Sequence, residues 1–308
     1  MGQAAERWPQ GRSETTSRPI SPINPPPPLL ALALAQALAL KKHFCTFAQE
    51  LCSDLHLCTA SSPVGCLSPC PRARLPPNLK MPTALITGTS QGLGLALAER
   101  LLADGWTVHG FARGPQVLTH ERFTAHVVDI TDETVVRAAV ASIAEAGSID
   151  LLINNAGAAS MNALLLTPAA VAERLMRVNY LGTFHCLQAV GKVMVRQRAG
   201  RIVNVTTVAV PLSLEGEAAY VASKAAVEAL TKVAARELAS SGIIVSAVGF
   251  GPIDTALTRA VPKAALAKIN DTIGRPQGTT MNQAVDYFVG HLAAADFKSG
   301  SVEYYGAV

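Results

Sequence analysis

The chain has 308 residues, of which 49% are hydrophobic and 16% are charged, so it can bury at least one large core. Its formal charge of +4 lies entirely in residues 1–80, because residues 81–308 carry equal numbers of basic and acidic side chains. A nucleic-acid-binding domain concentrates basic charge on its folded part, so we expect no nucleic-acid partner. The longest apolar run is too short for a membrane span, and we expect none.

Residues 1–80 differ in composition from the rest of the chain. They contain 12 of the 19 prolines and five of the six cysteines, without alternating strand and helix patterns. Such a segment buries too little surface to offset chain entropy, so we expect a disordered, dispensable leader. Two alternatives stay open: an arginine-containing targeting peptide, and a zinc site, although no Cys-x-x-Cys pair occurs. Because Cys186 alone follows the leader, we expect a cytoplasmic location, with organellar targeting by residues 1–80 left open.

From residue 81 onward, short apolar runs alternate with helical patterns. Strands are predicted at Thr83–Thr87, Thr107–Ala112, Ala125–Val128, Leu151–Asn154, Ile202–Thr206, Ile243–Val248 and Val302–Tyr305. Helices are predicted at Gly92–Asp104, at Asp132–Ala146 with Thr131 or Asp132 as its cap, as two helices within Thr167–Arg198, at Glu217–Ser240 and at Gln283–Ala295. This order predicts one α/β domain over residues 81–308, a doubly wound parallel sheet of the Rossmann type with helices on both faces. Ligands then bind at the carboxyl ends of the strands.

A glycine-containing turn, Thr87-Gly-Thr-Ser-Gln-Gly-Leu-Gly94, follows the first predicted strand. Its glycines allow the backbone to approach a pyrophosphate closely, and the next helix offers free N–H groups to that anion. The spacing differs from the common Gly-x-Gly-x-x-Gly fingerprint. We predict that this turn binds a dinucleotide through Gly88, Ser90, Gln91, Gly92, Leu93 and Gly94.

The second predicted strand ends in Gly110-Phe-Ala-Arg113 and lacks an acid there. An acid at this position suits the ribose hydroxyls of NAD, whereas an arginine can bind the 2′-phosphate of NADP in bidentate fashion. We therefore expect NADP rather than NAD. The alternative is that Arg113 is an ordinary solvated surface residue.

Tyr220 and Lys224 lie four residues apart in the Ala-rich helix and therefore share one face. A free tyrosine has a pKa near ~10, and a neighbouring ammonium favours the phenolate, so we expect Lys224 to lower the pKa of Tyr220 toward the range of a general acid–base. Thr207, just past a predicted strand, and Asn154-Asn-Ala-Gly157, at the end of another, emerge at the same sheet edge. The side chains of these residues can therefore meet in one site.

Together these motifs resemble the short-chain dehydrogenase/reductase family over residues 82–308. The resemblance rests on the Thr-Gly-x-x-x-Gly-x-Gly turn at 87–94, Asn-Asn-Ala-Gly at 154–157 and Tyr-x-x-x-Lys at 220–224. It implies that Tyr220 exchanges the substrate proton, that Lys224 also binds the nicotinamide ribose, and that Asn179 anchors a water relay. It further implies a set of cofactor contacts at Asp129 (adenine), Asn155, Ala156, Gly157, and Ile253 and Thr255 (carboxamide).

Two positions depart from the family pattern. Thr207 replaces the active-site serine, with Thr206 as the adjacent alternative; a threonine can still donate its hydroxyl, but its methyl group narrows the pocket. Phe250-Gly251 replaces the usual Pro-Gly after the sixth strand, which would reshape the nicotinamide pocket.

We therefore expect an NADP(H)-dependent oxidoreductase for a ketone, aldehyde or secondary alcohol, without a metal. Two alternatives stay open: an epimerase or dehydratase on the same scaffold, and a cofactor-binding regulator with degraded chemistry. The family resemblance implies a homodimer or homotetramer. We also expect residues 256–280 to cover the pocket, and His185 to be a packed or interface residue.

Overall fold

The computed structural model describes residues 81–256, 258, 261–294 and 298–306. The predictions for residues 1–80, namely a leader, a targeting peptide or a zinc site, lie outside the described residues and stay predictions.

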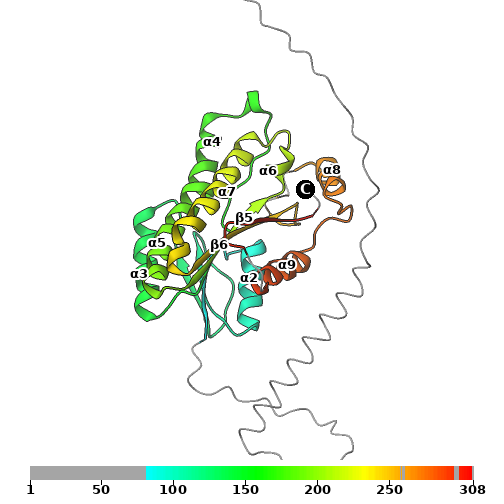
Figure 1. Cartoon of the computed structure of the whole chain (residues 1–308). Helices are drawn as coiled ribbons and strands as arrows, with labels where there is room; N and C mark the ends of the chain where they lie inside the picture. The colour runs from blue at the N-terminus through cyan, green and yellow to red at the C-terminus, as the bar shows by residue number, and fades with distance from the viewer. Residues whose placement is uncertain (1–80, 257, 259–260, 295–297, 307–308) are drawn as a thin grey trace, which may run out of the picture. The chain divides into compact units, whose positions relative to one another are not determined.

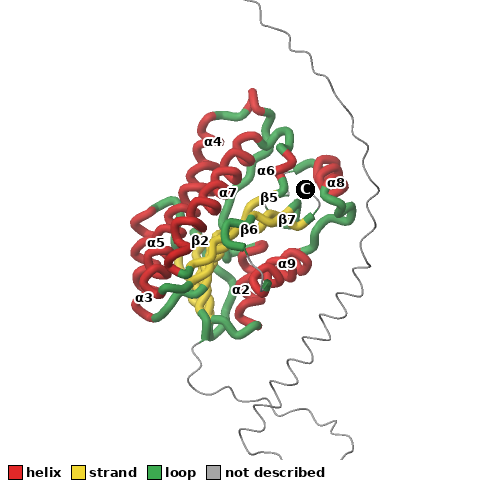
Figure 2. Tube along the Cα trace, viewed as in Figure 1, coloured by secondary structure: helices red, strands yellow, loops and turns green. Residues whose placement is uncertain are grey.

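The described chain folds around one parallel sheet with the strand order β3-β2-β1-β4-β5-β6-β7 (Figures 1 and 2). The strands are β1 (Thr83–Thr87), β2 (Thr107–Ala112), β3 (Phe123–Val127), β4 (Leu151–Asn154), β5 (Gly200–Thr207), β6 (Ile243–Phe250) and β7 (Val302–Tyr305). The chain moves outward from β1 to β3 and then returns to the other side of β1 with β4. Ligands bind in open sheets where the strand order reverses in this way, at the carboxyl ends of β1 and β4. The predicted doubly wound fold is confirmed.

Helices cover both faces of the sheet. They are α2 (Gly92–Ala103), α3 (Glu133–Ala146), α4 (Ala169–Leu175), α5 (Gly182–Gln197), α6 (Ala209–Leu212), α7 (Ala218–Leu238), α8 (Lys263–Thr272) and α9 (Met281–Ala293), with short helical turns η1 (Leu164–Leu166), η2 (Met176–Leu181) and η3 (Ala239–Ser241). None of those described is both long and apolar enough to cross a membrane.

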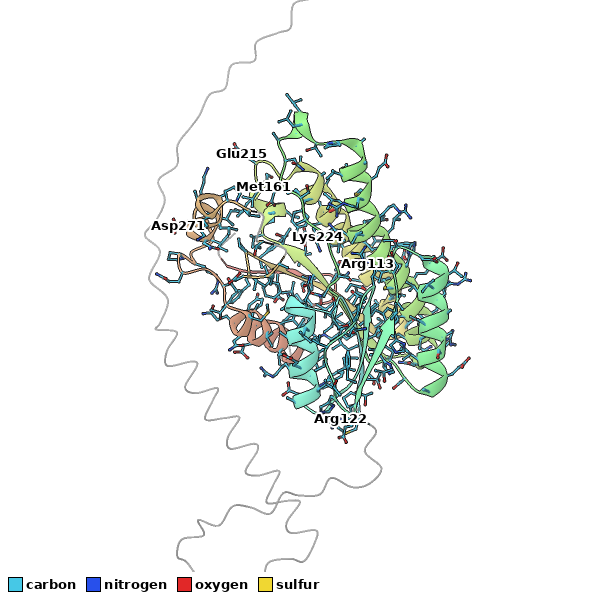
Figure 3. The ribbon with its side chains drawn as sticks, turned by 180° about the vertical axis from the view of Figure 1, so that it is seen from behind. Arg113, Arg122, Met161, Glu215, Lys224 and Asp271 are labelled. Atoms are coloured by element: carbon cyan, nitrogen blue, oxygen red, sulfur yellow. The ribbon has the colours of Figure 1, made fainter. Side chains whose placement is uncertain are left out.

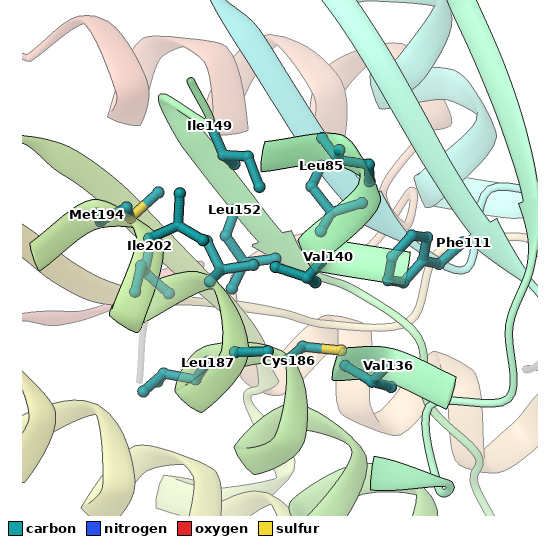
Figure 4. Close-up of a cluster of buried hydrophobic side chains, with 14 of the residues drawn as sticks. Leu85, Phe111, Val136, Val140, Ile149, Leu152, Cys186, Leu187, Met194 and Ile202 are labelled. Atoms are coloured by element: carbon teal, nitrogen blue, oxygen red, sulfur yellow. The ribbon is translucent and has the colours of Figure 1, made fainter. Parts of the chain in front are cut away.

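Alternating residues of the strands fill two separate cores. In β1, Leu85 packs into the cluster formed with α3, α5 and α7, whereas Ala84 and Ile86 pack into the cluster formed with α2 and α9. Figure 4 shows the first cluster, where Cys186 of α5 lies among aliphatic side chains. Because β1, β4 and β6 are largely buried on both faces, they read as nearly continuous apolar runs, which made them predictable.

Several predicted boundaries were wrong. The strand predicted at 125–128 runs from Phe123 to Val127, and β5 and β6 extend to Thr207 and Phe250, which pair with each other in register. Thr207 is therefore the last residue of β5, whereas the prediction placed it just after the strand. The cap of α3 is Asp132, whose Oδ1 accepts the N–H groups of Thr134 and Val135 at 2.9 and 3.1 Å, so the Thr131 alternative is wrong.

The two helices predicted within 167–198 are α4 and α5, and the prediction did not include the turn that joins them. α4 passes directly into η2, which is π-helical, and η2 passes directly into α5. The sequence prediction also missed α8 altogether.

Candidate active site

A cavity of about 450 Å³ opens at the carboxyl edge of the sheet. Segments that are far apart in the sequence meet there, including residues from the described part of the 256–280 segment, as expected. The predicted site residues that line it are Gly88, Ser90, Gln91, Gly92, Leu93, Arg113, Asp129, Asn155, Ala156, Gly157, Thr207, Tyr220, Lys224, Ile253 and Thr255. Gly94 and Asn179 are buried just behind its wall.

The glycine turn after β1 leaves a cradle without side chains. Gly88 and Gly92 have φ values of 78° and 62°, the left-handed region that favours glycine. The Gly88 N–H donates to the carbonyl oxygen of Phe111 at 2.7 Å. A Cβ at Gly94 would collide with the carbonyl oxygen of Gly88 and the amide of Asn155. The turn therefore requires glycine at these positions.

The N-terminus of α2 faces this cradle, and none of the described side chains caps its N–H groups. The N-cap Gln91 makes no side-chain capping bond, and the first turn of α2 contains no acid. A helix start with free N–H groups and no local carboxylate is suited to an anion such as a pyrophosphate. These residues fit a dinucleotide.

Arg113 and Asp129 lie at the β2 side of the cavity. Arg113 follows β2 and is exposed, while Asp129 Oδ1 accepts hydrogen bonds from the backbone N–H and the hydroxyl of Thr131, both at 2.9 Å. Burial alone would raise the pKa of Asp129, but the bonds from Thr131 and the charges of Arg113 and Arg177 outweigh it and lower the pKa. This end of the cavity therefore combines an exposed guanidinium with an ionised carboxylate (Figure 3 labels Arg113).

Thr207, Tyr220 and Lys224 come together at the β5 side of the same cavity. Thr207 and Tyr220 both line the cavity, and hydrogen bonding from the Thr207 hydroxyl would favour the phenolate, which lowers the pKa of Tyr220. Lys224 is buried, its Nζ donates to the carbonyl oxygen of Val205 at 2.8 Å, and a Cβ on Gly157 would lie 3.5 Å from that Nζ. The phenol and the ammonium, one helical turn apart, thus line one cavity.

The expected direction of the pKa shift of Tyr220 was wrong. Burial raises the pKa of Tyr220 to about 12 and the charge of Glu217 raises it further, while the hydrogen bond with Thr207 lowers it. Burial also lowers the pKa of Lys224 to about 8, against the opposing charge of Glu228. In this structure the phenol of Tyr220 is the protonated, donating form.

Asn179 connects the site to the protein behind it. Its Oδ1 accepts the N–H of Ala158 at 2.7 Å, and its Nδ2 donates to the Ala158 carbonyl oxygen and to Ser223 Oγ, both at 2.9 Å. Asn179 lies in the π-helical turn η2, and such turns often occur at functional sites. It fixes the segment after β4 against α7, beside Tyr220.

Thr206 has a different environment from Thr207. Its hydroxyl donates to Glu228 Oε1 at 2.7 Å, and Tyr304 also donates to that oxygen, at 2.8 Å. Thr207, not Thr206, lowers the pKa of Tyr220. The geometry favours Thr207 as the threonine of the site.

The remaining predicted residues have simpler surroundings. Phe250 lines the cavity and packs edge-on against the rings of Tyr287 and Tyr305. His185 is half-buried, has a ring nitrogen 3.0 Å from the carbonyl oxygen of Ile130, and does not line the cavity. It is a packed residue.

The sequence reasoning missed Glu217, which lines the cavity beside Tyr220. Its position three residues before Tyr220, on the same helical face, was a signal that could have revealed it. It also missed an apolar wall formed by Val178, Val208, Leu214, Val261, Leu266 and Ile269.

The chain is similar to several known proteins. The 3-oxoacyl-[acyl-carrier-protein] reductase FabG of Staphylococcus epidermidis is 36% identical over 194 residues, covering 58% of this chain and 78% of the relative. The Vibrio harveyi reductase of the same name is 36% identical over 191 residues, 60% of this chain and 78% of its own. The structure described as ElxO with NADP bound superimposes with a TM-score of 0.66 at 28% identity, covering 73% of this chain and 97% of ElxO.

A short-chain dehydrogenase from Streptomyces avermitilis gives a TM-score of 0.63 at 28% identity, covering 74% of this chain and 89% of that structure. The sequence profile of the family described as short chain dehydrogenase matches residues 82–265. The chain therefore belongs to the short-chain dehydrogenase family of oxidoreductases.

Proposed function

We propose that this chain reduces a ketone or aldehyde with NADPH, or oxidises the corresponding secondary alcohol with NADP. The observation that carries the proposal is that the hydroxyls of Thr207 and Tyr220 line the same cavity as the glycine cradle, with the buried ammonium of Lys224 one helical turn away. Proton donors and a dinucleotide cradle in one cavity are what a hydride-transfer enzyme supplies around its cofactor.

The cofactor would be bound along the β1–β4 edge. Gly88, Gly92 and the start of α2 would bind the pyrophosphate and Arg113 the 2′-phosphate. The family resemblance assigns Asp129 to the adenine, Asn155–Gly157 to the cofactor without a more specific role, Lys224 to the nicotinamide ribose, and Ile253 and Thr255 to the carboxamide. The NADP bound to ElxO, a similar fold, supports the choice of NADP. When bound, the nicotinamide supplies or accepts the hydride.

The side chains of this chain would orient the carbonyl and move the proton. Thr207 and Tyr220 would donate hydrogen bonds to the carbonyl oxygen, and Tyr220 would release its proton to that oxygen as negative charge develops there. The ammonium of Lys224 would stabilise the phenolate that remains. Asn179, bonded to Ala158 and Ser223, would keep this arrangement rigid.

Replacing Tyr220 with phenylalanine tests the proposal. We expect kcat to fall by about a thousandfold or more, because general acid–base catalysis contributes roughly 10²–10⁴-fold and the phenol also orients the substrate. The assay is the loss of reduced-nicotinamide absorbance over a panel of ketones and aldehydes, with product analysis to detect epimerisation or dehydration. Binding of NADPH, followed by its fluorescence, should stay within about threefold, since a single hydroxyl is removed.

Two substitutions of Thr207 provide the matched control. Thr207→Ser keeps the hydroxyl and should keep activity, whereas Thr207→Val removes the donor and should lose about 10²-fold. Full activity of Tyr220→Phe, or equal activities of the two Thr207 variants, would contradict the assigned roles.

We also propose that the chain forms a homodimer or homotetramer through its long helices. Exposed apolar side chains of the described domain include Leu181 at the end of η2, Val195 in α5 and Val233 in α7. Apolar groups on a helical face often mark a contact between subunits. Light scattering of the purified protein gives the oligomeric state.

A further inference from the structure

We propose that Glu217 selects the substrate by charge: the pocket takes a carbonyl compound that carries a hydrogen-bond donor, most favourably an ammonium group, near the reacting carbon, and disfavours a carboxylate there. This inference rests on the proposed function, because it concerns the substrate end of the same cavity.

The first argument is the position of Glu217 relative to Tyr220. Glu217 immediately precedes α7, lines the cavity, and lies three residues before Tyr220. Side chains three residues apart on a helix have Cβ atoms about 5–6 Å apart. A substrate whose carbonyl oxygen meets Tyr220 would therefore bring atoms about one to three carbons away from that carbonyl next to the carboxylate of Glu217.

The second argument is that no capping bond, hydrogen bond or ion pair among the described residues explains why position 217 is an acid. It occupies the N-cap position of α7, but its side chain makes no capping hydrogen bond. Aspartate, asparagine, serine or threonine would cap this helix better. Within the described residues its carboxylate also has no hydrogen bond and no ion pair, and its half-buried position is the cause that raises its pKa.

The third argument is the apolar character of the surrounding wall. The cavity that Glu217 lines has aliphatic side chains in its wall, namely Val178, Val208, Leu214, Val261, Leu266 and Ile269. The adjacent loop is held in place by the N–H of Asn162, which donates to the Gly216 carbonyl oxygen at 2.7 Å, with Met161 packed beside Gly216. A half-buried carboxylate in such surroundings is stabilised by a donor that enters with the substrate.

The fourth argument is electrostatic. The negative charge of Glu217 acts on Tyr220, because it raises the pKa of the Tyr220 phenol. A cation bound beside Glu217 would offset this charge, whereas a carboxylate would add a second negative charge next to it. The sign of the substrate's charge therefore affects both binding and the readiness of Tyr220 to give up its proton.

The test uses methyl ketones of matched length whose far end carries an ammonium, hydroxyl, methyl or carboxylate group, with one to four carbons between. The proteins are the full chain, Glu217→Gln and Glu215→Gln. Glu215 is the matched control, because it is exposed two residues upstream and does not line the cavity (Figure 3). The readout is the ratio of kcat/KM for the ammonium ketone to that for the carboxylate ketone.

We expect the ratio in Glu217→Gln to fall by at least about tenfold from that of the unaltered chain. The reason is that loss of a hydrogen bond between two charged groups typically weakens binding by about this factor or more. Glu215→Gln should keep the ratio within about twofold, as expected for a solvent-screened charge. An unchanged ratio in Glu217→Gln overturns the inference, and reduction of the methyl-terminated ketone in the same assay shows that the proposed function stands independently.

A binding measurement decides the inference without turnover. The melting temperature of the protein with NADP is measured with amino alcohols and with hydroxy acids of the same lengths. A larger stabilisation by the amino alcohols that disappears in Glu217→Gln supports the inference even if none of the ketones is reduced, in which case it is the proposed function that fails. Equal stabilisation by both classes overturns the inference.

Discussion

Lys224 and Glu228 lie one turn apart on α7 and are both buried, yet no hydrogen bond joins them in the described structure. Glu228 Oε1 instead accepts hydrogen bonds from Thr206 at 2.7 Å and Tyr304 at 2.8 Å, while Lys224 Nζ donates to the carbonyl oxygen of Val205. The carboxylate is thus fixed by β5 and β7, and it acts on the ammonium through space. This leaves the remaining protons of Lys224 available to the cavity.

Removing the charge of Glu228 should therefore change the titration of Lys224. Burial lowers the pKa of Lys224 to about 8, and the charge of Glu228 raises it. In Glu228→Gln we expect the ammonium to lose its proton at lower pH, so the alkaline limb of the kcat/KM profile moves down by about one pH unit. Glu237→Gln, an exposed acid on the same helix, is the control. An alkaline limb at the same pH in both variants would contradict the role of Glu228.

The identity of the cofactor depends on Arg113. In Arg113→Gln we expect the Kd for NADPH to rise by about 10–100-fold, because a bidentate arginine–phosphate contact is lost. The Kd for NADH, which lacks this phosphate, should change by less than about threefold. Both are measured by nicotinamide fluorescence. Arg137→Gln, an exposed arginine of α3, should leave both values unchanged. Equal weakening of NADPH and NADH would show that Arg113 does not distinguish them.

The central strands were predictable from the sequence because burial on both faces makes them largely apolar, whereas the edge strand β3 is partly exposed and its bounds were mispredicted. Leu151–Asn154 is buried at every position and was predicted to the residue. The ends of β5 and β6 were not predicted, since Thr207 and Phe250 pair only through the backbone register of the folded sheet. Helix α8 was missed because it is short, lies between Pro262 and Gly274, and buries only Ile269 fully.

The motifs identified many of the cavity-lining residues, but they did not predict the pKa shifts and hydrogen bonds of these residues. Tyr220 and Lys224 share a helical face, which sequence spacing alone establishes. The raised pKa of Tyr220 comes from burial and from Glu217, and the burial depends on tertiary packing that spacing does not reveal. The three hydrogen bonds of Asn179 likewise depend on a π-helical turn that has no distinct periodic signal in the sequence.

The close contacts around Gly94 predict the effect of replacing it with alanine. In Gly94→Ala the new methyl group collides with the Gly88 carbonyl oxygen and the Asn155 amide, neither of which can move without disturbing the turn. We expect a loss of about 1–3 kcal/mol in the free energy of unfolding, as is typical of overpacking, together with weaker NADPH binding. Gly114→Ala is the matched control, because a Cβ there meets no atom within 4 Å. Urea denaturation and an NADPH titration measure both effects, and two variants of equal stability would contradict the collision.

A pair of histidines on neighbouring strands should make the domain sensitive to acid. His109 Nδ1 lies 3.0 Å from His126 Nε2, across β2 and β3. Burial, and then the charge of His126, lower the pKa of His109 to about 4, and burial also lowers the pKa of His126. An unfolded histidine has a pKa near 6.5, so between about pH 6.5 and 4 the unfolded chain binds more protons than the folded one. The stabilising contribution of neutral His109 is therefore complete above pH 6.5 and is lost as the pH falls toward 4.

Urea denaturation at pH 7.5 and at pH 4.5 measures this contribution. Because the ring of His109 is partly exposed and its charge is screened, we expect it to account for about 1–2 kcal/mol of the acid-induced loss in unfolding free energy. His109→Gln removes the titrating group and relieves the repulsion on His126, so its unfolding free energy should fall less between the two pH values than that of the unaltered chain. If the variant loses as much stability as the unaltered chain, other groups cause the acid sensitivity and the histidine pair does not.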